Sequence, residues 1–257
     1  MLVLSDVHFA LEPLRKVAAS GETLLILGDL VNLTDYRTGE GAVAEVLGIE
    51  FSRASAAARG RGDFQQMRAL WLERVGDDLD EIRLAIGKAI DSQYERVAEA
   101  LNGGSGYVIH GNVDRPGSLQ RSLPAGYEYV HGDVREIDGA RFGFIGGGAA
   151  TPLQAEGEVS DETVEELLEV IGPVDVLCTH VPPALGPLRT DVVTGRAERG
   201  SVPILNYLEK HAPRLHLFGD VHQPQASTWR VGRTRCRNVG YFRATGRPVR
   251  LDTATIE

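Results

Sequence analysis

Short apolar runs that end in polar residues recur along the first half of the chain. Three of them, at residues 2–4, 23–27 and 107–109, have the length and composition of buried strands. Polar tips follow them directly: Asp6-Val7-His8, Gly28-Asp29 and Gly111-Asn112. Ligands of open α/β sheets bind just beyond the carboxyl ends of strands. The pattern therefore predicts an α/β fold with a site at these strand ends.

Between the second and third of these strands the apolar spacing becomes helical. From Phe64 to Leu101 apolar side chains recur every three or four residues, close to the helical repeat. Gly76-Asp77-Asp78 can divide this stripe into two helices, or the stripe can form one kinked helix. We predict one domain, 1–257, with a helical insertion over about 40–104 that packs on the core; a lid or dimer face is the alternative. The small and polar residues of 52–62 indicate a mobile segment.

The second half of the chain has more strand patterns. Strands are expected at 127–131, 134–137 and 141–145, and Asp138-Gly139 is a hairpin-turn signal between the last two. Residues 160–171 read as a helix capped by Ser160. Further strands are expected at 174–179 and 214–218, followed by a hairpin around Val231-Gly232.

Composition and charge exclude several classes of protein. The 257 residues are 42% hydrophobic and 25% charged, as in ordinary globular proteins, and the formal net charge is −9. The acidic excess argues against broad electrostatic binding of nucleic acid or of an anionic membrane. No apolar run is long enough to span a bilayer. The absence of a secretory signal and the two cysteines predict reduced thiols and a cytoplasmic location.

The polar tips of the predicted strands form a set of metal-ligating side chains. The set is Asp6, His8, Asp29, Asn112, His180, Asp220 and His222. Imidazole, carboxylate and amide groups together suit Mn, Fe, Zn or Mg. Asp and His seldom occupy such positions unless they are paired or bind a metal, so simple packing explains the set poorly. At an extended strand end, residues two apart point the same way, so Asp6 and His8 can bind one ion.

These blocks resemble the ordered motifs of calcineurin-like metallophosphoesterases. The family pattern is D-x-H, G-D, G-N-H-D/E, H and G-H-x-H, and the matching blocks here run from residue 2 to about 222. Each block alone is weak, but five in the right order are specific. The resemblance implies a four-layer α/β/β/α sandwich of two mixed sheets.

The resemblance also implies a hydrolase with two divalent metal ions. Asp6, His8, Asp29 and His222 would hold the first ion, and Asn112, His180 and Asp220 the second, with Asp29 bridging. Such a pair clamps a phosphoryl group and generates hydroxide at neutral pH. We therefore expect a Mn-dependent phosphohydrolase that acts on small phosphoesters, with phosphodiesters favoured over monoesters.

Two positions depart from the family pattern. Val113 stands where the family has the His that is usually credited with protonating the leaving group, and Asp114 then has no such His to orient. His131 or His110 is a candidate substitute, and Arg115 is a candidate for holding a substrate phosphate. Asp114, Arg115 and His131 are thus the predicted catalytic residues.

The second departure is Asp220, which replaces the first His of G-H-x-H. Three carboxylates and a bridging hydroxide would neutralise two divalent cations, so the second ion should be a hard one such as Mn or Mg. The alternative is that Asp220 points away and that the second ion binds weakly or not at all.

Several readings remain open at this stage. Gly146-Gly147-Gly148 can cradle a phosphate or form a tight turn. The seven arginines between Arg230 and Arg250 can form a phosphate-binding patch or balance the acidic segment 156–169; Arg233, Arg235 and Arg237 would share one face of a strand. The functional alternatives to the hydrolase are a catalytically weak binding module with the same fold, and a nuclease. Self-association through the helical insertion is a further expectation.

Overall fold

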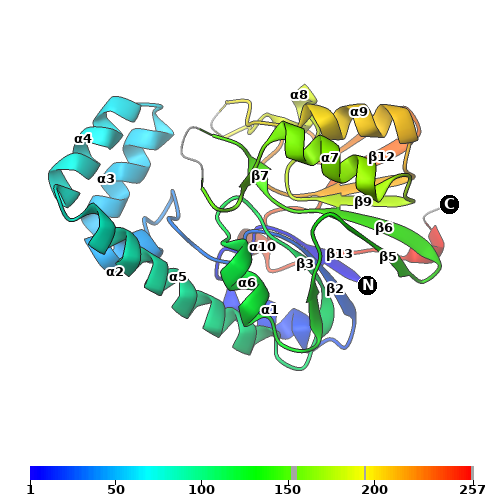
Figure 1. Ribbon diagram of the computed structural model, residues 1–257, viewed down its shortest axis with the longest axis horizontal. Helices are drawn as coiled ribbons and strands as arrows, with labels where there is room; N and C mark the ends of the chain where they lie inside the picture. Colours follow the sequence, from blue (N-terminus) through cyan, green and yellow to red (C-terminus); the bar gives the residue numbers. More distant parts are fainter. Residues whose placement is uncertain (152–154, 194, 256–257) are drawn as a thin grey trace. The chain divides into compact units, whose positions relative to one another are not determined.

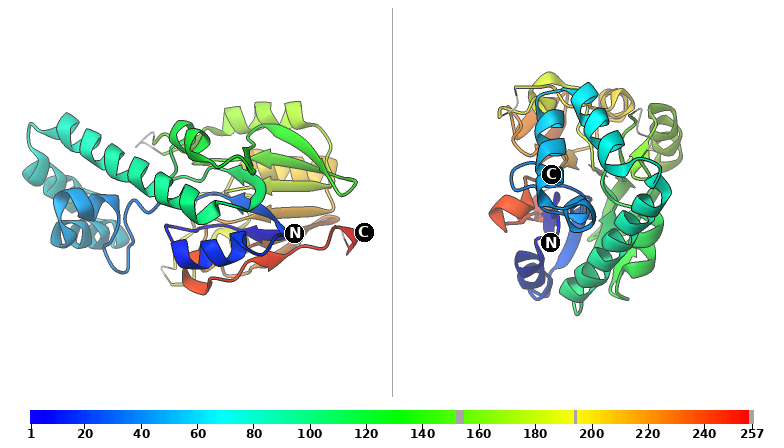
Figure 2. Two further views of the ribbon diagram at one scale, coloured as in Figure 1. Left: turned by 90° about the horizontal axis from the view of Figure 1, so that it is seen from below. Right: turned by 90° about the vertical axis from the view of Figure 1, so that its left-hand side faces the viewer.

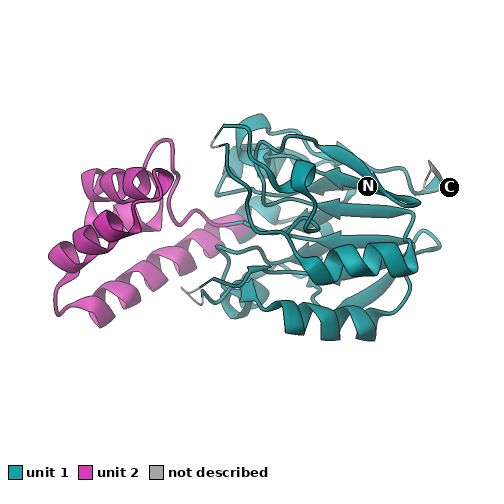
Figure 3. Ribbon diagram, turned by 90° about the horizontal axis from the view of Figure 1, so that it is seen from above, with its two compact units in different colours: residues 1–30, 98–257 teal, residues 31–97 magenta. Residues whose placement is uncertain are grey.

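The structure of the chain is a computed structural model that describes residues 1–151, 155–193 and 195–255. The chain forms two compact units (Figure 3). Unit 1 comprises Met1–Leu30 and Ala98–Glu257, and unit 2 comprises Val31–Val97.

One sheet of unit 1 has five strands in the order β13-β1-β2-β3-β4. The strands are β1 (Leu2–Leu4), β2 (Thr23–Leu27), β3 (Ser105–Ile109), β4 (Tyr127–Tyr129) and β13 (Val249–Arg250). β13 runs antiparallel to β1, and the other neighbours are parallel. The three strands predicted from the first half of the chain are therefore adjacent, and their carboxyl ends lie at one edge of the sheet.

The other sheet has six strands in the order β11-β12-β10-β9-β6-β5. The strands are β5 (Asp133–Ile137), β6 (Ala140–Ile145), β9 (Val176–Thr179), β10 (Leu215–Phe218), β11 (Thr228–Val231) and β12 (Thr234–Asn238). The hairpins β5–β6 and β11–β12 are antiparallel, and the central pairs are parallel. Both sheets are thus mixed, as expected.

Unit 1 is arranged in four layers (Figures 1 and 2), and hydrophobic cores lie between them. The first lies between the sheets and includes Val3, Leu25, Phe144 and Leu217. The second lies between the six-stranded sheet and helices α7 (Asp161–Ile171) and α9 (Val202–His211). Helices α1 (Leu11–Ala18) and α6 (Pro116–Ser122) cover the outer face of the five-stranded sheet. The fold is the predicted four-layer α/β sandwich.

Short elements complete unit 1. They are α8 (Gly186–Arg189), α10 (Phe242–Thr245), the two-stranded ladder of β7 (Gly148–Ala149) with β8 (Glu158–Val159), and a 3-10 turn at Thr253–Thr255. The sequence pattern did not indicate these elements, because none is long enough to show a hydrophobic period.

Local sequence explains two of the turns. Asp138 and Gly139 both have positive φ, at 50° and 79°, which is the geometry that a tight two-residue hairpin turn requires. The Ser160 hydroxyl accepts the backbone N–H of Thr163 and so caps α7. Both sequence predictions are confirmed.

Unit 2 is built from helices. They are α2 (Ala42–Leu47), α3 (Ile49–Gly60), α4 (Phe64–Val75) and α5 (Leu79–Leu101), the last of which continues into unit 1 from Ala98. The long stripe forms two helices rather than one kinked helix, since α4 ends at Gly76 with φ of 52°. The segment 52–62, which we expect to be mobile, is helical over most of its length, because the alanines there favour helix. Ser52, Ala56 and Ala58 are buried within α3.

Two further findings concern the whole described chain. Cys178 and Cys236 are buried free thiols. Among the described residues, no helix has the length and apolar character needed to cross a membrane.

Candidate metal centre

The predicted metal-ligating residues lie together at the carboxyl ends of strands in unit 1. Asp6 and His8 follow β1, Asp29 follows β2 and Asn112 follows β3. His180 follows β9 from the other sheet, and Asp220 and His222 follow β10. Both sheets of the sandwich therefore contribute to one cluster.

One group of donors consists of Asp6, His8 and His222, whose ligand atoms lie within 4.8 Å of one another. The Nε2 atoms of His8 and His222 are 3.1 Å apart. The Oδ1 atom of Asp6 is 3.3 Å from the Nε2 atom of His222 and 3.9 Å from that of His8. Three ligand atoms thus point at one small volume.

A second group shares a residue with the first and consists of Asp6, Asp29 and His180. The Nε2 atom of His180 is 3.6 Å from Asp29 Oδ1 and 3.8 Å from Asp220 Oδ1. Asp29 also reaches the first group, since its Oδ2 atom is 3.6 Å from His8 Nε2. Asp29 therefore connects the two groups, because one of its carboxylate oxygens lies near His8 and the other near His180. Asp220 points toward the second group rather than away from it.

The histidine in the second group is fixed in one orientation. His180 is fully buried, and its Nδ1 atom lies 2.7 Å from the carbonyl oxygen of Leu27. A carbonyl only accepts, so Nδ1 carries the proton in this hydrogen bond. The lone pair of Nε2 is then available to a cation, which is the usual arrangement of a metal-bound histidine.

The buried acceptors of the cluster test whether it fits a cation. The Asn112 amide lies against Asp29, and with its NH2 group turned toward that carboxylate it donates to Oδ2 and Oδ1 at 2.9 and 3.2 Å. The same amide lies 3.3 Å from His180 Nε2, so Asn112 is within reach of two residues of the second group. The Oδ1 atom of Asp6 is also buried without a hydrogen-bond partner among the described residues. Buried acceptors of this kind cost free energy unless a ligand satisfies them, so the donor set fits a metal ion.

The donor residues have an unusual backbone. Asp6, His8, Asp29 and Asp220 have φ of 58°, 40°, 56° and 66°. Left-handed geometry costs a non-glycine residue roughly 1–3 kcal/mol and clusters at functional sites. Four of the seven donors carry this strain, which marks the strand ends as a site rather than ordinary loops.

Glycine allows the strand ends to approach each other. A Cβ on Gly111 would lie 2.1 Å from Asp29 Oδ1, and one on Gly148 would lie 2.2 Å from the Cβ of Asn112. The glycine run at 146–148 thus packs directly against the loop that carries Asn112. This contact, with φ of 103° at Gly147, favours a tight turn over a phosphate cradle.

Charges within the cluster shift its pKa values in opposite directions. Burial opposes ionisation of Asp29, but His180, His8 and the N–H of Val113 together lower its pKa well below the ordinary value. Burial alone would lower the pKa of His180, yet Asp29, Asp220 and Asp6 raise it well above 6.5. Burial raises the pKa of Asp220 to about 7 against the opposing effect of His180. A divalent cation would take over the role of the His180 proton as the partner of these carboxylates.

Asp114, the first predicted catalytic residue, lies behind the donors. Its Oδ2 atom accepts the N–H groups of Asp29 and Gly111 at 2.7 and 2.8 Å, and its Oδ1 atom accepts that of Leu30 at 3.0 Å. Burial, together with the charge of Asp29, raises its pKa to about 6. The carboxylate therefore ties the loop after β2 to the loop after β3.

Arg115 and His131, the other predicted catalytic residues, have partners of their own. Arg115 Nε donates to Glu156 Oε1 at 2.9 Å. The Nδ1 atom of His131 accepts the N–H of Gly146 at 3.0 Å, and its ring lies edge-on to that of His110 at 4.8 Å. His110 is buried and contacts the Tyr129 hydroxyl at 2.8 Å, and burial lowers its pKa to about 3. Because Nδ1 of His131 accepts the N–H of Gly146, the neutral His131 ring carries its proton on Nε2.

The segment Tyr241–Arg243 contacts the first group and was missed by the sequence analysis. The Tyr241 ring stacks on His222 at 3.9 Å with an interplanar angle of 2°. The N–H groups of Phe242 and Arg243 donate to the carbonyls of Ser5 and Asp6 at 3.1 and 3.0 Å, and the Arg243 guanidinium donates to the carbonyl of His8. No motif marks this segment in the sequence, since one aromatic residue after a strand is common.

Comparison with known proteins adds information on the fold. No protein-family model matches the chain, and no curated protein matches its sequence. Among solved structures the chain is similar to TT1561 of Thermus thermophilus, with a TM-score of 0.56 and 14% identity over 94% of this chain and 89% of that one. A candidate 5'-nucleotidase from Staphylococcus aureus, solved with α-ketoglutarate, aligns with a TM-score of 0.42 and 13% identity over 93% of this chain and 48% of that one. At these identities the likeness to TT1561 shows a shared fold and leaves the activity to the site.

Proposed function

We propose that the protein is a metallophosphoesterase: a metal-dependent hydrolase of small phosphoesters, with phosphodiesters preferred over monoesters. The observation that carries this proposal is the pair of donor groups that share Asp6 and lie on either side of Asp29. Two such groups side by side are the arrangement that two-metal phosphoester hydrolysis needs. The ordered motifs that resemble the calcineurin-like family support the same conclusion.

In this proposal Asp6, His8, Asp29 and His222 hold one divalent ion, and Asn112, His180, Asp220 and Asp29 hold the other. Bound divalent cations supply Lewis-acid stabilisation of phosphoryl charge and lower the pKa of bound water. Manganese is the favoured metal because carboxylate and amide oxygens make up most of the second group. The carboxylates of Asp6, Asp29 and Asp220 would offset most of the charge of two divalent cations and so limit how electrophilic the site becomes.

The residues around the donors account for the preferred substrate. Val113 has no proton to give to a leaving group, and Asp114 is engaged by three backbone N–H groups. A substrate whose leaving group departs as a stable anion needs no such proton. His131 remains the proposed catalytic residue for less activated substrates, because the Nε2–H of its neutral ring can donate a hydrogen bond to the leaving-group oxygen. Arg115 is the proposed phosphate ligand on release from Glu156.

The test is metal-dependent turnover of an activated aryl phosphodiester. Protein stripped with a chelator should be inactive, and added Mn²⁺ should restore hydrolysis of bis(p-nitrophenyl) phosphate more strongly than that of p-nitrophenyl phosphate. His222→Ala should lower turnover at least a hundredfold, while the control His211→Ala, in the last turn of α9, should leave it unchanged.

Two outcomes would reject the proposal. Turnover that is independent of metal, or equal in both histidine variants, would place the activity elsewhere. Binding of less than one equivalent of Mn²⁺ without turnover would favour the binding-module alternative.

A further inference from the structure

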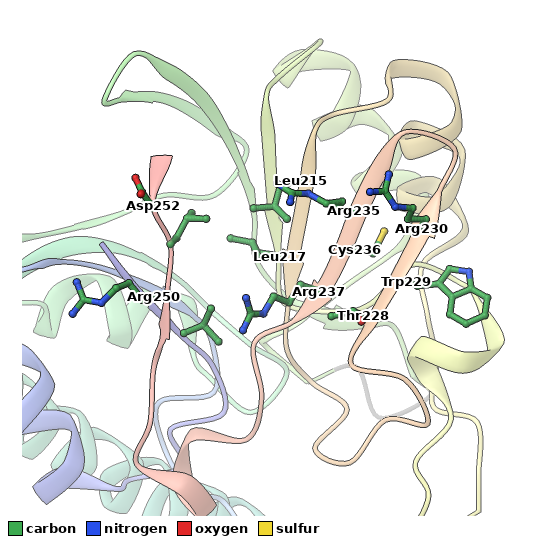
Figure 4. Close-up of a pocket in the computed structure, with 12 residues that line it drawn as sticks. Leu215, Leu217, Thr228, Trp229, Arg230, Arg235, Cys236, Arg237, Arg250 and Asp252 are labelled. Atoms are coloured by element: carbon green, nitrogen blue, oxygen red, sulfur yellow. The ribbon is translucent and has the colours of Figure 1, made fainter. Parts of the chain in front are cut away.

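A groove of about 650 Å³ lies in unit 1 between β13 of one sheet and β10–β12 of the other (Figure 4). Its apolar wall includes Leu215 and Leu217 from β10 together with Val249 and Leu251 from β13 and the chain after it. All four also contact the core between the sheets. The groove is therefore a continuation of the hydrophobic core that opens at the side of the sandwich, and none of the residues that line it is a donor of the metal centre.

The inner face of the six-stranded sheet changes from leucine to arginine at this groove. In the register between β10 and β12, Leu215 pairs with Arg235 and Leu217 with Arg237. In the register between β11 and β12, Arg230 pairs with Arg235. Side chains of paired residues lie on the same face of a sheet. Three guanidinium groups thus extend the face that carries the core leucines.

Positive charge is concentrated at this groove. Arg230 lies opposite Arg235 on the neighbouring strand, and like charges in such positions repel each other. Arg250 at the opposite wall is neutralised by a bidentate pair with Glu22, at 2.7 Å for both bonds, and its side chain points away from the groove. Within the part of the chain that the structure describes, Arg230 and Arg237 form no ion pair.

The sequence is also compatible with arginines that only balance the acidic segment 156–169. Glu156 of that segment forms a salt bridge with Arg115. Arg250 pairs with Glu22, outside the segment. The structure therefore favours a binding role for the arginines over direct neutralisation of this segment.

We propose that this groove binds a small anionic amphiphile: a molecule with a phosphate, phosphonate or carboxylate head and an aliphatic or aromatic body. Guanidinium groups bind such heads through paired, charge-assisted hydrogen bonds. Arg237 supplies them, since its side chain points across the groove toward β13 (Figure 4), and Arg230 adds positive charge to the same wall. The body lies against Val249 and Leu251, which are half-buried, whereas Leu215 and Leu217 form the buried floor of the groove. The volume is within the range of small-molecule sites, and the one carboxylate of the lining, Asp252, lies at the end of the groove far from Arg237.

Calorimetric titration of the full chain with n-alkylphosphonates of four to eight carbons, below micelle formation, tests this proposal. Phosphonates are not hydrolysed by a phosphoesterase, so binding is separated from the proposed activity. We expect the affinity to rise about two- to fourfold for each methylene buried. Arg230→Gln and Arg237→Gln should each weaken binding about tenfold. Arg233→Gln, an exposed residue of the same hairpin outside the lining, is the matched control and should have no effect.

The outcomes separate this groove from the metal centre and from a membrane surface. Equal affinity with and without EDTA supports the proposal, whereas loss of binding with EDTA or in Asp29→Asn would assign the ligand to the metal centre and overturn it. Affinity that does not depend on chain length would also overturn it. So would binding to anionic phosphatidylglycerol vesicles without binding to the monomeric phosphonates. The chain-length series requires no variant, so misfolding of an arginine variant would not block the test.

Discussion

At the scale of residues, the metal centre is defined by strain and by unsatisfied acceptors. Asp6, His8, Asp29 and Asp220 hold left-handed backbone geometry that glycine would adopt at little cost. The Oδ1 atom of Asp6 has no hydrogen-bond partner among the described side chains and backbone groups. Stability alone favours neither feature, and a bound cation accounts for both.

Tyr241 is a residue-scale test of how the first donor group is held. Replacement by Ala removes the ring that stacks on His222, so the imidazole should lose its fixed orientation. We expect Mn²⁺ binding to weaken about tenfold in Tyr241→Ala, as for loss of a residue that orients a ligand, and to stay near wild type in Tyr241→Phe. Isothermal titration of the metal-free proteins measures this; equal loss in both variants would contradict a role for the ring face.

Asp114 provides a second test at this scale. An Asn side chain offers one acceptor oxygen where Asp114 uses two to bind three N–H groups. At least one buried N–H would then be unpaired, at a cost of about 1–3 kcal/mol. Asp114→Asn should lower the thermal midpoint by several degrees in the metal-free protein, while the more exposed control Asp133→Asn should not. An unchanged midpoint would mean that these hydrogen bonds do not hold the loops.

At the scale of elements, β9 and β10 are joined by a buried histidine. His216 Nε2 lies 2.9 Å from Thr179 Oγ1, whose hydroxyl donates to the carbonyl of Val181 at 2.7 Å, so the ring nitrogen is the donor to Thr179. The Nδ1 atom of His216 is buried without a partner among the described groups. Burial lowers the pKa of His216 from 6.5 to about 3, so the folded protein keeps this ring neutral.

This histidine predicts a pH dependence of stability. Between pH 6.5 and 3 the unfolded chain binds a proton at His216 that the folded chain does not, so its contribution to the free energy of unfolding falls as pH falls. Relative to His216→Gln, the wild type should lose about 2 kcal/mol between pH 7.5 and pH 5, from about 1.36 kcal/mol per unit. Urea denaturation of both proteins with EDTA measures this difference; parallel pH curves would contradict it.

Self-association is expected to involve the helices of unit 2. Phe64 and Leu72 on α4 are 62% and 63% exposed, although both are large and apolar. We propose that this helix contacts a second copy, so Phe64→Ser with Leu72→Ser should convert a dimer to a monomer in sedimentation velocity. Glu73→Ser, at an exposed position on another face of α4, is the control and should not. A wild-type monomer at all concentrations would contradict this.

The sequence was informative where elements are long or periodic. The strand ends after β1, β2 and β3 were predicted because each apolar run stops at a polar residue, and the α4–α5 stripe because its period extends over many turns. β13 and α10 were not predicted: each spans only a few residues and depends on contacts with Ser5, Asp6 and Met1 that are distant in sequence. The partners of Arg115 and His131 depend likewise on tertiary packing, so their side-chain contacts could not be read from the chain.

At the scale of the whole molecule, the net charge of −9 is distributed unevenly over the protein. Asp6, Asp29 and Asp220 belong to a cluster that cations would neutralise, so a phosphate ester would be attracted by the bound ions rather than repelled by the protein. The arginines of β11 and β12 concentrate positive charge at a separate groove. Anionic ligands can therefore bind this acidic protein at two places, provided that they are small.

Anomalous diffraction from crystals soaked in Mn²⁺ tests the central claim most directly. The proposed centre predicts two manganese peaks about 3.5–4 Å apart, one among Asp6, His8 and His222 and the other beside His180 and Asn112, with Asp29 between them. A single peak at the first group would contradict the two-metal arrangement. The absence of any peak at these strand ends, in crystals that bind manganese elsewhere, would contradict the metal centre itself.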